Sequence, residues 1–378
     1  MKVAVTGAGG FIGKNLVLAL ARLPGLSIRE LGRESTAREW ESALASADFV
    51  YHLAGVNRPE RDEDFFTGNA ELTERLCMSL SRQECPPAIV LASSIHATLD
   101  TGYGRSKRQA ENAVREYSRH TGAPVFLFRL SGVFGKWCRP DYNSVVATFC
   151  HRIVHDLPIT ISDPAKVIAL VYIDDVVRAF LRVLEDGEVS KSGEFHEVRP
   201  IYRVALGDLV DRLRSFRNTR SSLGLPDMAD PFVRALYATY LAGLPEDGFA
   251  YALPRREDPR GVLAEAIKSP HCGQIFVSRT RPGATRGGHY HDSKVEKFLV
   301  LEGDAIVRFR HVLGGDLIEY RVAGVELRVM DIPPGYTHEI ENVGQGELVV
   351  MFWANEVFDA ASPDTHALAL HDRRIGNS

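Results

Sequence analysis

The chain contains few cysteines, and their spacing shows no pairing. Five occur among 378 residues, an odd number, without a CxxC or CxxH pattern: Cys77, Cys85, Cys138, Cys150 and Cys272. A disulfide framework is therefore not expected, and a reducing cytoplasm is the expected setting.

Other absences exclude further classes of function. No apolar run is long enough to span a bilayer. No charged and then apolar leader precedes the first expected strand at Lys2, so no signal peptide is expected. Lysine and arginine number 45 against 49 aspartate and glutamate, a net charge of −4. We therefore expect neither a nucleic acid nor an anionic membrane as the main partner.

The length favours two domains, and the first of them alternates strands with helices. Buried strands are expected at residues 2–6, 48–53, 88–92 and 125–129, and helices at 12–23, 71–80 and 105–119. This alternation predicts a parallel sheet with helices on both faces, an α/β Rossmann domain.

The pattern changes in the second part of the chain. Residues 206–244 read as irregular helices, and 247–261, with Pro254 and Pro259, suit a connector. From Gln274 onward, apolar and polar residues alternate in short runs that predict an antiparallel sandwich or barrel. We expect an α/β domain at 1–245, a connector at 246–262 and an all-β domain at 263–378.

A glycine-rich turn follows the first expected strand. Gly7, Gly10 and Gly13 have the spacing GxxGxxG between that strand and a helix. Gly7 permits a tight turn, Gly10 lets the backbone approach a pyrophosphate, and Gly13 allows close helix–strand packing. The context favours a dinucleotide site over a turn without a ligand.

The residue that would meet the adenine ribose is basic. Arg33 follows the expected second strand, where an acid would accept the ribose hydroxyl of NAD. An arginine there would pair with a 2′-phosphate, which favours NADPH, although a solvated loop residue fits nearly as well.

A tyrosine just before the expected helix at 105–119 and a lysine within it have helical spacing, so their side chains are expected on one face. Tyr103 and Lys107 are four residues apart, and Ser94, or else Ser93, ends the strand before them. The ammonium is expected to lower the pKa of the phenol, which would protonate a carbonyl oxygen as hydride arrives. The alternative is a solvated helix face, and the order of the motifs favours the functional interpretation.

Three histidines and a glutamate in the last part of the chain have the chemistry of a metal site. His289 and His291 alternate along an expected strand, Glu296 is placed on the neighbouring strand, and His338 on a distant strand pair. Imidazoles and a carboxylate suit Zn²⁺, Fe²⁺, Mn²⁺ or Ni²⁺. A metal-free barrel that keeps these residues is the alternative.

The first two-thirds of the chain resemble an extended short-chain dehydrogenase/reductase. The matching motifs are TGxxGFxG at 6–13, HLAG at 52–55, Asn69, the serines 93–94, Tyr103 with Lys107, and residues 129–135 and 172–175. The resemblance implies that Phe11, Ile12, Leu53, Ala54 and Gly55 also contact the cofactor. Two features depart from the family: residues 33–48 lack a usual strand, and Ser94 lies unusually close to Tyr103.

The last part resembles a metal-binding cupin, a jelly-roll barrel. Its motifs are GxHxH…E…G, from Gly287 to Gly303, and PxGxxH, from Pro333 to His338. The whole chain resembles the CapF family of bifunctional capsular-polysaccharide enzymes. That resemblance implies a zinc-bearing cupin that epimerises C3 of a UDP-linked 2-acetamido-2,6-dideoxy-4-ketohexose. It also implies an NADPH-dependent domain that reduces the C4 ketone to the L-talose isomer, and a homodimer.

Several points stay open at this stage. The C3 base is not evident, and Lys297, Tyr290 and Glu339 lie near the motifs. The basic residues Arg58, Lys136 and Arg139 are candidates for the diphosphate. Alternatives are a reductase with a merely dimerising cupin, a non-enzymatic nucleotide-sugar sensor, and an iron cupin with oxygen chemistry.

Overall fold

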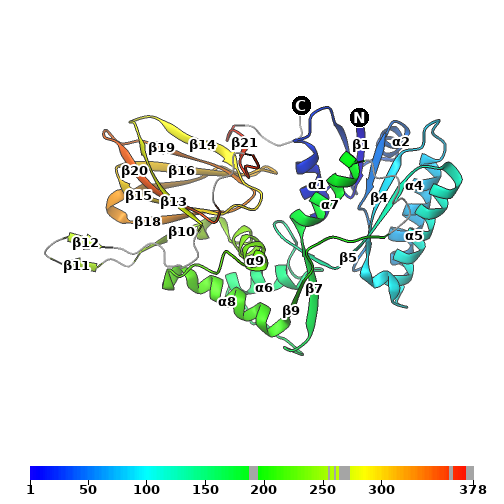
Figure 1. The fold of residues 1–378 in the computed structure, drawn as a ribbon, viewed down its shortest axis with the longest axis horizontal. Coiled ribbons are helices and arrows are strands. Elements are labelled where there is room, and N and C mark those ends of the chain that lie inside the picture. Colours follow the sequence, from blue (N-terminus) through cyan, green and yellow to red (C-terminus); the bar gives the residue numbers. More distant parts are fainter. Residues whose placement is uncertain (187–194, 254–255, 259–260, 264–272, 357–360, 372–378) are drawn as a thin grey trace.

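The structure is a computed structural model with two lobes joined by a helical layer (Figure 1). It describes residues 1–186, 195–253, 256–258, 261–263, 273–356 and 361–371. The expected start of the all-β domain, residue 263, is the last residue of the range 261–263. Cys272 lies outside the described residues. Over the described residues, no helix combines the length and the apolar character that a membrane crossing would need.

The first lobe is built on a parallel sheet with the strand order β2-β1-β3-β4-β5-β8. Its strands are β1 (Lys2–Thr6), β2 (Ser27–Leu31), β3 (Phe49–His52), β4 (Ala88–Ser94), β5 (Val125–Leu130) and β8 (Phe195–His196). The expected parallel sheet is confirmed.

Alternate residues of these strands enter two different cores. Val3, Val5 and Tyr51 pack with α1 (Phe11–Leu20) and α7 (Ile173–Asp186), whereas Ala4 and Val50 pack with helices on the other face. Those helices are α2 (Ala37–Ala45), α4 (Leu72–Leu80) and α5 (Gly102–Thr121). The short α3 (Glu63–Phe65) and η1 (Phe66–Glu71) directly precede α4. Sheet faces covered on both sides are typical of a Rossmann domain.

The segment 33–48, in which no strand was expected, forms a helix. Thr36 and Glu39 make a reciprocal capping box that begins α2 at Ala37. Each side chain satisfies a free backbone N–H of the first turn, so the chain passes directly from β2 through a helix to β3.

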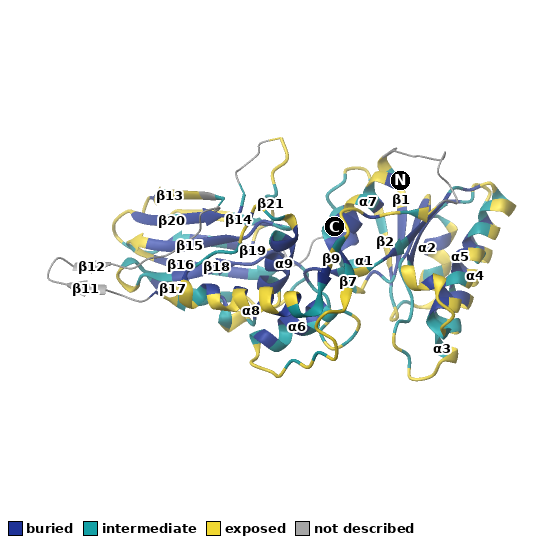
Figure 2. Ribbon diagram, turned by 60° about the horizontal axis from the view of Figure 1, so that its bottom comes forward, coloured by how far each residue is buried: buried dark blue, intermediate teal, exposed yellow. Residues whose placement is uncertain are grey.

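A helical layer connects the lobes, as the pattern at 206–244 predicts. It comprises α6 (Val145–Val154), α8 (Leu206–Ser222) and α9 (Pro231–Ala242), beside a small sheet of β6 (Gly132–Phe134), β7 (Val167–Tyr172) and β9 (Tyr202–Ala205). Helix α9 is buried along most of its length, and one apolar core runs from the first lobe through α9 into the second. Figure 2 shows exposed residues mainly on the outer sides of the helices.

The second lobe consists of two antiparallel five-stranded sheets, as expected for a cupin-like domain. One has the order β10-β18-β15-β20-β13 and the other β17-β16-β19-β14-β21. The first contains β10 (Ala250–Ala252), β18 (Arg328–Ile332), β15 (Glu296–Glu302), β20 (Leu348–Ala354) and β13 (Gln274–Thr280). The second contains β17 (Ile318–Ala323), β16 (Asp304–His311), β19 (Tyr336–Asn342), β14 (Thr285–Tyr290) and β21 (His366–Ala367).

The segment expected as a connector contains strands. β10 pairs with β18 of the barrel, and β11 (Arg256–Asp258) pairs with β12 (Gly261–Leu263). Three-residue strands are too short to show a period of two, so the sequence pattern does not reveal them.

A buried histidine joins β1, β3 and α4. His52 Nδ1 lies 2.7 Å from Thr6 Oγ1, and its Nε2 lies 2.9 Å from Thr73 Oγ1. Because Thr73 donates its own hydrogen to the carbonyl of Asn69, Nε2 is the donor to Thr73 and Nδ1 accepts from Thr6. Burial, with Lys107 nearby, lowers the pKa of His52 to about 3.

This histidine makes the free energy of unfolding depend on pH. Between about pH 6.5, the usual pKa of histidine, and pH 3, the unfolded chain binds a proton that the folded chain excludes. We expect stability to fall with decreasing pH in this window, by about 1.4 kcal/mol per pH unit from this residue. Urea unfolding of His52→Gln at pH 7 and 5 should show a weaker pH dependence. The exposed His120→Gln should not, and equal slopes in all three proteins would contradict the assignment.

Candidate functional site

The glycine turn brings the backbone of three segments together. Gly7 has φ +70°, and a Cβ there would lie 2.7 Å from the nitrogen of Ala54. A Cβ on Gly13 would lie 2.2 Å from the Gly7 carbonyl oxygen, so only glycine fits between the turn and α1. Gly10 is the N-cap of α1 and supplies no side chain to it. The first backbone N–H groups of the helix are therefore free to bind an anion.

The other residues expected at a dinucleotide lie at the same edge of the sheet. Leu53, Ala54 and Gly55 directly follow β3, Phe11 and Ile12 begin α1, and Arg33 is exposed after β2. In parallel α/β sheets, the carboxyl ends of the strands form the crevice that binds ligands. The structure thus places these expected cofactor residues at one edge of the parallel sheet.

Ser94 and Tyr103 are in contact despite the short loop between them. The Ser94 hydroxyl lies close enough to the Tyr103 phenol to lower the pKa of the phenol, and η2 (Ile95–Thr98) takes up half of the intervening chain. Ser93, the alternative, is turned away and donates to the buried Glu111 at 2.6 Å. This placement favours Ser94 over Ser93 as the candidate partner of Tyr103.

The expectation that Lys107 lowers the pKa of the phenol is wrong for this structure. Burial raises the pKa of Tyr103, and the Ser94 hydrogen bond only partly opposes this. Lys107 is 7% exposed and donates from Nζ to the carbonyl oxygen of Ala92 at 3.1 Å. Burial lowers the pKa of Lys107 to about 8, although Glu111 opposes this shift. Loss of water is the largest cause of both pKa shifts.

Asn69 holds the segment beside Lys107 in place. Its side chain donates to the carbonyl of Val56 at 3.0 Å and to Ser106 at 3.1 Å, and it accepts from the Val56 N–H at 2.9 Å. A Cβ on Gly55 would lie 2.6 Å from Asn69 Oδ1. The asparagine therefore fixes the backbone next to the candidate proton donor.

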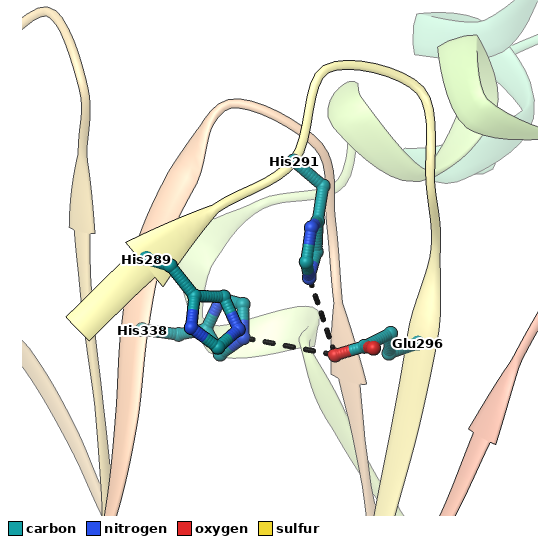
Figure 3. Close-up of side chains that lie close together, drawn as sticks. All are labelled: His289, His291, Glu296 and His338. Atoms are coloured by element: carbon teal, nitrogen blue, oxygen red, sulfur yellow. Dashed lines mark ion pairs between the residues drawn. The ribbon is translucent and has the colours of Figure 1, made fainter. Parts of the chain in front are cut away.

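The four expected metal ligands converge in the second lobe (Figure 3). Ligand atoms of His289, His291, Glu296 and His338 all lie within 4.8 Å of one another. Glu296 Oε2 is 3.3 Å from His291 Nε2 and 3.7 Å from His338 Nε2. Such a set of nitrogen and oxygen donors suits a divalent transition metal.

The expected placement of two of these ligands is wrong. His338 is not on a distant strand pair, because β19 pairs with β14 and His338 lies directly opposite His289. Glu296 is not on a strand that neighbours β14: it begins β15 in the facing sheet. The site therefore forms across the barrel, and a β-bulge between Gly287 and His289 adjusts the pairing beside it.

The orientation of two imidazoles fits a bound cation. His291 Nδ1 lies 2.6 Å from the Asp364 carbonyl oxygen, and His338 Nδ1 lies 3.3 Å from that of Tyr336. Nδ1 is then the donor, and Nε2 carries the free lone pair. Both Nε2 atoms are buried and have no hydrogen-bond partner among the described residues. Buried polar atoms without partners are rare, and a metal ion would satisfy them.

Burial and contacts favour the ligand forms of these groups. Burial lowers the pKa of His338 to about 3 and also lowers the pKa of His289. For Glu296, burial alone would raise the pKa, but the contact with His291 at 3.3 Å and other nearby charges lower it to about 2. Neutral imidazoles and an ionised carboxylate are the states that bind metal.

The cluster lines a cavity of about 270 Å³ with mainly apolar walls. Phe276, Phe298 and Phe352 are among the wall residues, and the polar groups include Arg286, Lys294, Glu356 and Thr365. Burial raises the pKa of Glu356, with Asp364 adding to the effect. Sequence analysis missed Lys294 and Glu356. Lys294 lies between two ligands, which is a usable signal, but no motif points to Glu356.

The three residues near the motifs that were considered as a C3 base are engaged elsewhere. Lys297 contacts Asp331 and, at 3.2 Å, the Tyr251 hydroxyl. Tyr290 accepts a hydrogen bond from Arg22, and Glu339 pairs with Arg308. Lys297 and Tyr290 sit next to ligands on their strands, so their side chains leave the opposite face.

The three basic residues considered as diphosphate ligands have different environments. Lys136 is 3% exposed and pairs with Asp174 at 2.7 Å, so its charge is already neutralised inside the protein. Arg139 lies over the Tyr142 ring, and Arg58 lines a surface pocket with Asn143 and Ser144. Only Arg58 and Arg139 remain candidates for the diphosphate.

Comparisons with known proteins agree with this two-part architecture. The model of the NAD dependent epimerase/dehydratase family matches residues 3–198, and that of the polysaccharide biosynthesis C-terminal domain matches 256–366. A UDP-2-acetamido-2,6-beta-L-arabino-hexul-4-ose reductase from Pseudomonas aeruginosa is 47% identical over 98% of this chain and 99% of that protein.

Solved structures give the same result. The capsular polysaccharide assembling protein CapF from Staphylococcus aureus is 42% identical, with a TM-score of 0.67 over 98% of this chain and 100% of that chain. A UDP-glucuronic acid 4-epimerase from Bacillus cereus shares the fold of the first part. It is 20% identical, with a TM-score of 0.52 over 58% of this chain and 84% of that chain. The chain therefore belongs to the NAD dependent epimerase/dehydratase family, in the group that carries a polysaccharide biosynthesis C-terminal domain and includes CapF.

Proposed function

We propose that this protein is a bifunctional nucleotide-sugar enzyme of capsular or O-antigen polysaccharide biosynthesis. Its cupin-like domain epimerises C3 of a UDP-2-acetamido-2,6-dideoxy-4-ketohexose. Its Rossmann domain then reduces the C4 ketone with NADPH to UDP-2-acetamido-2,6-dideoxy-L-talose, toward UDP-N-acetyl-L-fucosamine. The name of the Pseudomonas aeruginosa relative, a reductase of a UDP-linked 4-keto sugar, supports the substrate class and the reduction.

One observation carries the division into two steps: the chain holds two separate sets of polar groups. Tyr103, Ser94 and Lys107 lie beside the glycine turn, and the His–Glu cluster lies in a cavity of the other lobe. Each set suits one kind of proton movement. A single active site would use only one of these two sets of polar groups.

In the reduction, the chain's own groups handle the carbonyl oxygen. Tyr103 protonates O4, and the hydroxyl of Ser94, already in contact with the phenol, orients the same oxygen. Lys107 holds a buried charge beside the crevice edge, anchored on Ala92. When bound there, the nicotinamide supplies the hydride for C4.

In the epimerisation, three imidazoles and one carboxylate would hold the metal: His289, His291, His338 and Glu296. A bound divalent cation, for which Zn²⁺ is the proposal, would supply positive charge that stabilises the enolate oxygen on C4 when C3 loses its proton. Besides these ligands, Lys294 and Glu356 face the cavity and are the groups placed to move that proton. The raised pKa of Glu356 favours proton acceptance.

The protein is also proposed to act as a homodimer. β13 is an edge strand, and it exposes Ile275, Phe276 and Val277. An apolar edge strand of this kind is a surface that a second chain would cover.

Tyr103→Phe separates the two steps. We expect NADPH oxidation to fall by about 10²–10⁴-fold, because the proton donor of the reduction is lost. Incubation of the 4-keto substrate in D₂O should still introduce deuterium at C3, as followed by NMR. If both activities disappear in a folded variant, the division of labour is wrong.

His338→Ala is expected to have the opposite effect. Removal of one ligand should empty the site, so metal content should fall from about one ion per chain and deuterium should no longer enter at C3. NADPH-dependent reduction of a substrate already inverted at C3 should persist. The exposed His120→Ala is the matched control. Full C3 exchange in metal-free protein would contradict this role and favour a purely structural barrel.

Arg33→Ala tests the preference for NADPH. Loss of a charged contact to the 2′-phosphate should raise KM for NADPH about tenfold and leave KM for NADH unchanged. Steady-state kinetics with both cofactors measure the ratio. An unchanged ratio would place Arg33 in the solvated loop, without a role at the cofactor.

A further inference from the structure

The residue between two candidate metal ligands, at the end of β14, is buried on the opposite side of the backbone from the cavity. Tyr290 lies between His289 and His291, and its side chain leaves the strand on the side away from the cavity. It is 1% exposed and packs with Leu18 of the first lobe and Val312 of the second. Arg22, just beyond the end of α1, lies over the Tyr290 ring at 5.0 Å and donates from Nε to its hydroxyl at 2.8 Å.

Arg22 also forms a paired contact with Asp292, the residue that follows His291. Nη2 of Arg22 donates to Asp292 Oδ1 at 2.7 Å, and Nη1 donates to Oδ2. Paired, planar contacts of this kind hold both side chains in one orientation. The side chains are only 23% and 26% exposed, so water screens the contact weakly.

Asp364 binds residues 292–294, in the loop between His291 and Glu296, on the side opposite Arg22. Its carboxylate accepts the N–H groups of Asp292, Ser293 and Lys294 at 2.7, 2.8 and 2.6 Å. Its carbonyl oxygen accepts from His291 Nδ1. Residues 292–294 are thus fixed between Arg22 of one lobe and Asp364 of the other, just before Glu296.

A second contact between the lobes supports the strand of the remaining histidine. Trp137 lies against Gly335, where a Cβ would be 2.9 Å from the indole ring. Gly335 has φ +79° and donates its N–H to the carbonyl of His291. It directly precedes β19, which carries His338. The first lobe therefore contacts the turns beside both metal-bearing strands.

We propose that Arg22 is a positioning residue for the metal centre. The helix that begins at the dinucleotide turn ends at the arginine that orients the loop joining His291 to Glu296. This inference rests on the proposed function only in that the His–Glu cluster binds a metal ion. Loss of a partner behind metal ligands typically weakens metal binding about 10–100-fold.

The test compares Arg22→Met, Asp292→Asn and their double variant in the full-length protein. Arg22→Met keeps the length of the side chain and removes its charge and donors. Arg119→Met, which removes an exposed ion pair with Glu116, is the matched control. Affinity for Co²⁺ is measured by competition with a chelating indicator, NADPH affinity by fluorescence, and order of residues 289–296 by hydrogen exchange.

We expect Arg22→Met to weaken Co²⁺ binding at least about tenfold and to speed exchange in the loop, with NADPH affinity unchanged. The double variant should be no worse than the worse single one, because both substitutions remove one shared contact. Arg22→Lys should restore part of the affinity.

Three results would overturn the inference: unchanged Co²⁺ affinity and unchanged exchange in Arg22→Met, additive losses in the double variant, or equal losses of Co²⁺ and NADPH affinity that report general unfolding. Failure of the proposed function looks different. In that case the unaltered protein binds no transition metal, and the exchange data alone decide whether Arg22 orders the loop.

Discussion

The alternation of side chains along one short strand governs much of this structure. His289 and His291 point into the barrel, and Tyr290 between them points into the contact between the lobes. A shift of one residue would exchange these faces and place a phenol in the cavity. Because the same backbone serves both faces, any contact that holds Tyr290 and Asp292 also holds the two imidazoles.

Burial sets the chemistry at both candidate sites, with different results. Around the metal cluster, it keeps His289 and His338 neutral and leaves two lone pairs without hydrogen bonds. Around Tyr103 and Lys107, it disfavours the charged form of each group. A phenol that keeps its proton is suited to donate it. A lysine with a pKa of about 8, a value that the charge of Glu111 helps to raise, stays largely charged at neutral pH.

Local patterns were sufficient where the chemistry lies close together in the chain. The glycine turn, the Tyr103–Lys107 pair and the alternating histidines follow from short spacings, and the structure places each on the expected element. Predictions across longer separations were less successful. Glu296 was placed on a neighbouring strand and His338 on a distant one, because sequence spacing does not say which strands pair. Lys297 and Lys136 lay near the motifs but are used in buried ion pairs.

The sequence by itself determined the fold class of both lobes, the family, and the residue types of both candidate sites, because periodicity and turn chemistry act over a few residues. Only the tertiary structure decided that Ser94 rather than Ser93 meets Tyr103, and that Lys294 and Glu356 face the cavity. It alone joins Arg22 to Asp292, which are 270 positions apart in the chain. Contacts at such separations depend on how whole sheets and helices pack, and no local pattern encodes them.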